Sequence, residues 1–150
     1  MSEKIKIIIN GKETEAKRDT FLLNSIKELG IKIPTLCFHK DLAPNGSCRL
    51  CMCEIEDARG RKKMVTACNF PIRGEIKVNT QSDKVKKHKK MLAEMYLSRW
   101  PEVPTIKKIA KDCNVTETRF ENEFTDTNPN ACILCGRCTR ACDEFVLDRI

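Results

Sequence analysis

The chain has 150 residues, of which 41% are hydrophobic and 33% are charged, and its formal net charge is +7. This length suits one ordinary domain or two very small ones, and the composition is typical of a globular chain rather than a membrane protein. No segment approaches the about 20 apolar residues of a membrane span, and Lys6 breaks the N-terminal apolar run, so neither a span nor a signal peptide is expected.

The N-terminal part of the chain is expected to form a small mixed sheet with one helix. Residues 4–9 show the period of two that indicates a half-buried strand. Asn10-Gly11 predicts a tight hairpin turn, since a type I′ turn favours positive φ at both central positions, and residues 12–17 return as the partner strand. Thr20 can cap a helix that Gly30 ends and whose apolar face consists of Leu22, Ile26 and Leu29.

Residues 31–50 are expected to be mostly loop, because prolines and an Asn-Gly pair interrupt them. Three further strand patterns follow, at residues 51–55, 64–67 and 76–78. With the hairpin and the helix, these strands predict a compact sheet that has a single helix across it.

Helices are expected after residue 80, where the composition changes. Residues 82–99 contain no Gly or Pro and predict one helix, and an apolar stripe that ends at Cys113 predicts a second. A third, short helical piece can begin at Thr118, which has capping-box spacing with Glu121. Residues 125–131 form a polar, turn-rich linker. The expected parts are therefore residues 1–80, a helical connector at 81–124 and a C-terminal segment at 125–150.

Two groups of cysteines have spacings that suit iron–sulfur clusters. The first group lies mostly in the expected loop and consists of Cys37, Cys48, Cys51 and Cys68. A [2Fe–2S] cluster needs four thiolates that converge on a small rhomb, and a loop wrapped around it also directs backbone N–H groups at the sulfurs. Gly46, Ser47 and Arg49 are small or donor-rich residues suited to such a close approach of the backbone.

The second group of cysteines follows the spacing of bacterial ferredoxins and predicts a [4Fe–4S] cluster. It consists of Cys132, Cys135, Cys138 and Cys142, with Asp143 where those ferredoxins have a proline. Zinc is the main competing metal, but structural zinc sites usually pair two C-x2-C motifs about 12–20 residues apart. Iron–sulfur ligation is therefore favoured over zinc, and over buried structural cysteines, for both groups.

The remaining two cysteines are expected to be small buried apolar residues. Cys53 alternates onto the same strand face as Cys51, and Cys113 extends the apolar stripe of the second connector helix. Several lysines between residues 84 and 90 form a basic patch, which either steers an acidic redox partner or is a solvated helix face. Few aromatic residues and no recognition-helix pattern accompany the positive charge, so nucleic-acid binding is not expected.

The glycines limit which cofactors the chain can bind, and the cysteines bear on its expected cellular location. No two glycines form a G-x-G, so neither a dinucleotide fingerprint nor a P-loop can be built, and nicotinamide or flavin chemistry is expected on another chain. Without a secretory signal, the chain is expected in the reducing cytoplasm, where many cysteines indicate metal binding more often than disulfides.

Four segments of this sequence resemble a known family of iron–sulfur subunits. IPTLCFH, GSCRLCMCEIE and TACNFPIRGEIKVNT resemble the N-terminal [2Fe–2S] domain of the large iron–sulfur subunit of bacterial complex I. The same domain opens many [FeFe]-hydrogenases and the iron–sulfur subunits of NAD-linked hydrogenases and formate dehydrogenases. ACILCGRCTRACDEF resembles the later [4Fe–4S] module of those subunits. The resemblance implies an α+β chain with a β-grasp, ferredoxin-like [2Fe–2S] domain, a helical segment and a short [4Fe–4S]-binding module.

The sequence departs from this family in two places. Family members carry a His/Cys-ligated cluster between the two modules, but here Cys113 is the one cysteine between His88 and the terminal group, so that cluster is expected to be absent. The family also continues with another cysteine motif, and in two-cluster ferredoxins the fourth cysteine of one motif ligates the other cluster. Cys142 is favoured as the fourth ligand, with Cys113 or a partner residue as the substitute.

The resemblance implies an electron-transfer subunit of an NAD(P)-linked oxidoreductase complex, with no catalytic activity of its own. Such a subunit relays single electrons between a flavin- and NAD(P)-binding subunit and a further redox subunit or ferredoxin, in a hydrogenase, a formate dehydrogenase or an electron-bifurcating transhydrogenase. A free-standing, diffusible ferredoxin is the alternative, and an iron–sulfur redox sensor is less favoured.

Overall fold

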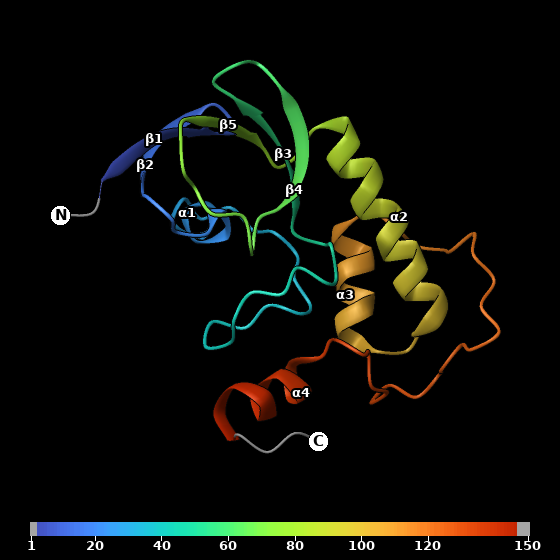
Figure 1. Ribbon diagram of the computed structural model, residues 1–150. Coiled ribbons are helices and arrows are strands. Elements are labelled where there is room, and N and C mark those ends of the chain that lie inside the picture. The colour runs from blue at the N-terminus through green and yellow to red at the C-terminus, as the bar shows by residue number, and fades with distance from the viewer. Residues whose placement is uncertain (1–2, 147–150) are drawn as a thin grey trace. The chain divides into compact units, whose positions relative to one another are not determined.

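The computed structural model describes residues 3–146 (Figure 1). The chain divides into two compact units. The first consists of the residues up to Ser82 together with those from Cys135 onward, and the second consists of Asp83–Leu134. The first unit contains the β-sheet, so the mixed α+β architecture expected from the sequence is confirmed.

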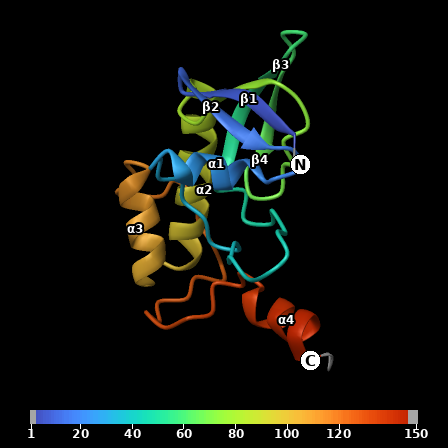
Figure 2. The same cartoon turned by 90° about the vertical axis from the view of Figure 1, so that its left-hand side faces the viewer.

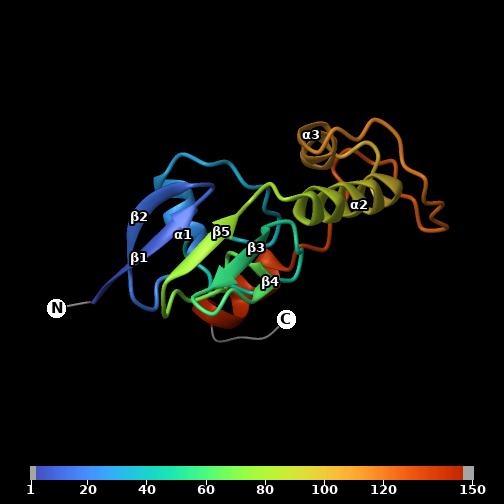
Figure 3. The same cartoon turned by 90° about the horizontal axis from the view of Figure 1, so that it is seen from above.

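A five-stranded mixed sheet is the framework of the first unit. Its strand order is β2-β1-β5-β3-β4 (Figure 3), with β1 parallel to β5 and the other neighbouring pairs antiparallel. Each strand expected from the sequence is present, with ends that shift by a residue or two. The strands are β1 (Lys4–Ile9), β2 (Lys12–Lys17), β3 (Met52–Asp57), β4 (Lys62–Thr66) and β5 (Ile76–Asn79).

The alternating isoleucines of β1 turn one face of the strand into the core, as the period of two predicts. Ile5, Ile7 and Ile9 are all buried, while Lys4 and Lys6 are exposed and Ile8 is half-buried. Asn10 and Gly11 both have positive φ, at 50° and 82°, which is the backbone that the hairpin signal anticipates. This turn fixes the antiparallel register of β1 and β2.

Helix α1 (Leu22–Glu28) lies across the sheet and closes the core (Figure 2). Its side chains Leu22, Leu23 and Ile26 are fully buried against the isoleucines of β1. The expectation that Thr20 caps this helix is wrong, because its hydroxyl donates to the Lys17 carbonyl at 2.6 Å and the N-cap residue is Phe21. The hydroxyl is therefore used to close the turn after β2, and the helix starts without a side-chain cap.

Replacing Ile26 by alanine is expected to destabilise the first unit by roughly 2–5 kcal/mol, because it leaves a cavity between α1 and the sheet. Glu28→Ala, in the same helix but at an exposed position, should change the free energy of unfolding by no more than about 0.5 kcal/mol. Urea unfolding curves of the two variants measure this difference. Equal midpoints for both would contradict the packing described here.

The second unit is built on two helices, α2 (Asp83–Arg99) and α3 (Pro104–Asp112), which pack side by side in Figures 1 and 2. The apolar stripe of α3 is buried as predicted, through Ile106, Ile109 and Ala110. The third helical piece expected at Thr118 is not formed. The hydroxyl oxygen of Thr118 instead accepts the N–H of Phe120 at 3.1 Å, which stabilises a turn in place of a helix.

The chain returns to the first unit through a short helix that sequence periodicity did not indicate. Helix α4 (Arg137–Ala141) continues into a π-helical turn (Cys142–Val146). Gly136 precedes α4 with a positive φ of 68°. This segment carries two of the four cysteines of the C-terminal group, Cys138 and Cys142.

Candidate metal centre

Three cysteines of the first group lie in the long loop between α1 and β3, and the fourth lies in the turn after β4. Cys37 and Cys48 belong to the irregular part of the loop, and Cys51 is the residue before β3. The Ala67 N–H donates to the Cys51 carbonyl at 3.1 Å, which brings the turn that carries Cys68 next to the end of the loop. All four thiols are therefore gathered in one unit, and each cysteine is at most 7% exposed.

Helix α1 helps to position the turn that carries Cys68. The N–H of Leu23 donates to the Ala67 carbonyl at 2.8 Å, and the N–H of Leu22 donates to the Phe70 carbonyl at 2.9 Å. These two donors belong to the first turn of the helix, where N–H groups have no partner within the helix. The uncapped start of α1 thus anchors the segment on both sides of Cys68.

The four thiols lie in two pairs. The Sγ atoms of Cys37 and Cys48 are 3.4 Å apart, and the thiols of Cys51 and Cys68 hydrogen-bond to each other. Within residues 3–146, no three His, Cys, Asp or Glu side chains gather around a point where they could hold a single metal ion. Two neighbouring pairs of thiols match the demand of a two-iron rhomb, in which each iron takes two thiolates.

Hydrogen-bond donors around the sulfurs favour the thiolate form at two of these cysteines. A hydrogen bond from the Cys68 thiol, together with nearby backbone N–H groups, lowers the pKa of Cys51 to about 6 despite its burial. The same thiol–thiol hydrogen bond and burial raise the pKa of Cys68. Burial raises the pKa of Cys37, but donors on Cys48 and Ser47 outweigh it, so the net shift is downward. Donors aimed at sulfur stabilise the negative charge that a bound cluster places there.

The loop approaches the Cys68 turn most closely at Gly46, where a side chain has no room. Gly46 has a φ of +70°, and a Cβ built there would lie 2.7 Å from Nδ2 of Asn69. Asn69 is itself held by a hydrogen bond from the Thr66 hydroxyl. Gly46 therefore meets two demands at once, a left-handed backbone and contact with the residue that follows Cys68.

Gly46→Ala is expected to lower the cluster content of the purified chain and to cost more stability than a left-handed backbone alone. Gly60→Ala is the matched control, because Gly60 has a φ of +75° but nothing within 4 Å of a new Cβ. The control should lose only the roughly 1–2 kcal/mol of a left-handed alanine. Iron per chain and the thermal unfolding midpoint are measured on both variants. The difference between the variants gives the effect of the clash with Asn69, apart from the effect of the left-handed backbone that they share. Equal losses in the two variants would show that the contact with Asn69 has no effect.

The structure divides the C-terminal cysteine group between the two units. Cys132 belongs to the second unit, whereas Cys135, Cys138 and Cys142 belong to the first. Cys132 and Cys138 are exposed, and Cys135 and Cys142 are partly buried. Cys113, the expected substitute ligand, lies just after α3 in the second unit, and burial raises the pKa of its thiol. The assignment of this group as cluster ligands stays a prediction.

The cysteine expected to be a buried core residue of β3 is found as such. Cys53 is fully buried and belongs to the hydrophobic core of the first unit. Its thiol donates to the carbonyl of Cys51 at 3.5 Å. Cys53 thus lies two residues from a proposed ligand and points into the core.

A set of polar contacts between the C-terminal segment and the cysteine loop has no counterpart in the sequence patterns. Arg137 and Arg140 donate to backbone carbonyls between residues 36 and 43, and Glu144 accepts the N–H of Ala43. These partners are 97 to 103 residues apart in the sequence. No local period or spacing signals contacts across such a separation, so these residues could not be identified from the sequence.

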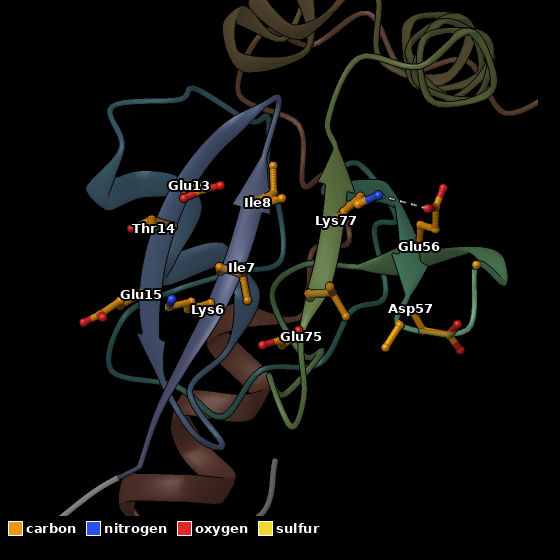
Figure 4. A pocket seen from close by; sticks show the side chains of 13 residues that line it. Lys6, Ile7, Ile8, Glu13, Thr14, Glu15, Glu56, Asp57, Glu75 and Lys77 are labelled. Carbon is orange, nitrogen blue, oxygen red and sulfur yellow. Dashed lines mark ion pairs between the residues drawn. The ribbon is translucent and has the colours of Figure 1, made fainter.

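The outer face of the sheet has a hollow of about 630 Å³, and none of the described residues that line it is a cysteine (Figure 4). Charged side chains of four strands surround it, among them Lys6, Glu13 and Glu15. Lys77 pairs with Glu56 at 3.5 Å across the hollow. Exposed charges of both signs are typical of a solvated sheet face, and we assign no cofactor to this hollow.

Comparison with known proteins identifies the family of the chain. The family model described as a 2Fe-2S iron-sulfur cluster binding domain matches residues 2–83, which is more than half of the chain. The chain therefore belongs to this family of [2Fe–2S] cluster-binding domains. The Cys37, Cys48, Cys51 and Cys68 thiols all lie within the matched segment.

Two curated relatives match nearly the whole chain. It is 30% identical over 162 residues to NADPH-Fe(3+) oxidoreductase subunit alpha of Geobacter sulfurreducens, a match that covers 95% of this chain and 19% of that protein. It is 28% identical over 164 residues to an NADH-quinone oxidoreductase subunit of Rhizobium meliloti, again covering 95% and 19%. The expected relationship to iron–sulfur subunits of NAD(P)-linked oxidoreductases is confirmed. The chain spans about a fifth of the length of these relatives.

A solved structure has the same fold. The crystal structure of an NAD+-reducing [NiFe]-hydrogenase in the H2-reduced state contains a chain that matches with a TM-score of 0.73 and 23% identity. The match covers 92% of this chain and 65% of that chain. At this level of identity the comparison shows a shared fold.

Proposed function

We propose that the chain is an electron-transfer iron–sulfur subunit of an NAD(P)-linked oxidoreductase complex, with no catalytic activity by itself. The observation that carries the proposal is the gathering of four buried thiols, in two pairs, within a domain that belongs to a [2Fe–2S] family. Both curated relatives described above have names that denote subunits of NAD(P)H-dependent oxidoreductases. The complex that contains this chain is of the hydrogenase, formate dehydrogenase or electron-bifurcating transhydrogenase type.

Cys37, Cys48, Cys51 and Cys68 would hold the [2Fe–2S] cluster, on a domain of the β-grasp type. The donor set fits this group, because four thiols converge and backbone N–H groups of the loop surround them. The bound cluster supplies reversible uptake of one electron. The residues of the chain keep water away from the sulfurs, fix the positions of the thiolates and direct donors at them.

Cys132, Cys135, Cys138 and Cys142 would hold a [4Fe–4S] cluster, and Cys113 is the substitute for Cys142. The ferredoxin-type spacing supports this assignment, and so does the likeness of the surrounding segment to the later module of the family. We propose the functional parts as a [2Fe–2S] domain at 1–80, a helical connector at 81–124 and a [4Fe–4S]-binding segment at 125–150.

The proposed partners are a flavin- and NAD(P)-binding subunit and a further redox subunit or ferredoxin. Large apolar side chains are exposed in both units, with Phe124 at 71% and Phe145 at 64%. Such exposure favours a chain that is covered in an assembly over a ferredoxin that diffuses freely.

We propose the cytoplasm as the location of the chain, because thiols stay reduced there. Within residues 3–146, no helix is long and apolar enough to cross a membrane.

Native isolation tests the subunit role. The chain, tagged in its own cells and purified without oxygen, should elute in a complex and co-purify with a chain that binds flavin and oxidises NADH or NADPH. The reduced nicotinamide should then bleach the visible absorbance of the iron–sulfur clusters. Elution as a persistent monomer that still carries its clusters would favour the diffusible ferredoxin and contradict the subunit role.

A further inference from the structure

The C-terminal segment is fastened to the loop that carries Cys37 by side chains that all bond to the loop backbone. Nε of Arg137 donates to the Leu36 carbonyl at 2.6 Å, and the Ala43 N–H donates to the Glu144 carboxylate at 2.8 Å. Two further bonds come from Arg140. All the residues involved belong to the first unit.

Arg140 is the residue that contacts both ligand segments. Its Nη2 donates to the carbonyl of Cys37, and its Nη1 donates to the carbonyl of Ala43 at 2.7 Å. Its Nε donates to the carbonyl of Gly136 at 3.3 Å, between Cys135 and Cys138 of the other cysteine group. One guanidinium thus spans the backbone of a proposed [2Fe–2S] ligand and the backbone of the proposed [4Fe–4S] motif.

An arginine is well suited to this place because its donors are arranged in a rigid planar fork and its charge is permanent. Bonds from a charged donor are shorter and roughly twice as strong as bonds between neutral groups. The guanidinium therefore holds the two segments together and also fixes a positive charge against the backbone of Cys37. Reduction adds one electron, and so one negative charge, to a cluster, and a nearby fixed positive charge favours the reduced state.

We propose that Arg140 is a positioning residue that ties the C-terminal segment to the [2Fe–2S] loop and raises the reduction potential of that cluster. This inference rests on the proposed function, since it needs a [2Fe–2S] cluster on Cys37 and its partners. Arg137 and Glu144 hold the same two segments in register, at the Leu36 carbonyl and the Ala43 N–H. Of these three residues, Arg140 is the one that bonds to Cys37 itself, through the Cys37 carbonyl.

The test is a potentiometric titration of the [2Fe–2S] cluster, followed by EPR, on the full 150-residue chain purified without oxygen. Arg140→Gln removes the charge and keeps a donor, and Arg140→Lys keeps the charge and removes the fork. Arg73→Gln is the matched control, because Arg73 is an exposed arginine of the same unit that pairs with Asp19 at 2.8 Å. Iron per chain is measured on every sample.

R140Q is expected to lower the equilibrium constant for one-electron reduction by roughly threefold to tenfold, and tenfold corresponds to about 59 mV. R140K should fall between R140Q and the wild type, and R73Q should match the wild type. An R140Q chain that binds its full iron and titrates at the wild-type potential would overturn the proposal. A shift of equal size in R73Q would overturn it as well, because the effect would then belong to surface charge in general.

If R140Q binds no cluster, R140K decides the matter. A cluster in R140K with a potential below that of the wild type supports the proposal, and one at the wild-type potential overturns it. Loss of the cluster in both variants would also overturn it, because Arg140 would then serve assembly rather than the potential.

The iron content of the wild type separates this inference from the proposed function. About two iron atoms per chain would remove the [4Fe–4S] cluster from the proposed function. The R140Q titration would still test the effect of Arg140 on the potential of the [2Fe–2S] cluster. A wild-type chain without iron would overturn both.

Discussion

Cys51→Ala is expected to abolish the [2Fe–2S] cluster, whereas Cys53→Ala, two residues further along, is expected to keep it. Cys51 lies in hydrogen-bond contact with the Cys68 thiol, so its removal leaves one iron with an incomplete set of ligands. Cys53 points into the core, and its loss should cost roughly 0.5–1.5 kcal/mol, as for one buried methyl group. Iron analysis should show a loss of about two atoms per chain in C51A alone.

The comparison of these two cysteines is stringent because they are two residues apart in the sequence and are equally buried. A general sensitivity of the fold to the loss of a buried thiol would affect both variants alike. EPR of the dithionite-reduced chains should show the [2Fe–2S] signal in C53A and not in C51A. The reverse result would exchange the roles of the two residues and contradict the ligand set.

Cys142→Ala is expected to lose the [4Fe–4S] cluster, with a fall of about four iron atoms per chain, while Cys113→Ala keeps it. The spacing of the C-terminal group favours Cys142, and the raised pKa of the partly buried Cys113 thiol makes it a poorer source of thiolate. The [2Fe–2S] EPR signal should survive in both variants and serves as the internal control.

Two other results would redirect the assignment of the fourth ligand. Loss of four iron atoms in C113A but not in C142A would make Cys113 the ligand. Retention of all iron in both variants would point to a ligand from a partner subunit or from solvent.

The elements of the first unit that the sequence predicts well are those with a local cause. The alternation of Ile5, Ile7 and Ile9 defines both a strand and its buried face, because period-two patterning depends on neighbouring residues alone. The Asn10-Gly11 turn follows from the two residues that occupy it. The parallel pairing of β1 with β5 joins residues about 70 positions apart, and no local pattern encodes it.

The two wrong helix predictions share one physical reason. Thr20 and Thr118 have the residue type and spacing of helix caps, but each hydroxyl hydrogen-bonds to a nearby backbone group that closes a turn. A threonine hydroxyl serves a cap and a turn equally well, so composition cannot choose between them. For Thr20 the error amounts to a helix start displaced by a short distance along the chain. For Thr118 the error is larger, because the helix expected there is not formed.

The candidate site also contains one part that local sequence patterns predict and one part that they do not. The cysteine spacings predict which thiols act together. The structure brings the four thiols of the first group into one unit in two pairs, and their role as cluster ligands stays a prediction. The contacts that fasten the C-terminal segment to the loop could not be anticipated, because Arg137 and Arg140 look like ordinary basic residues of a cysteine motif. Their role depends on carbonyls that lie about a hundred residues earlier in the chain.

Metal and sulfide analysis of the anaerobically purified chain, combined with EPR after reduction, tests the central claim most directly. Eight cluster thiolates predict about six iron and six acid-labile sulfide atoms per chain, and two EPR signals that differ in their temperature dependence. A brown protein with this stoichiometry is the expected result. A colourless protein that contains zinc or no metal, with no sulfide, would contradict the account.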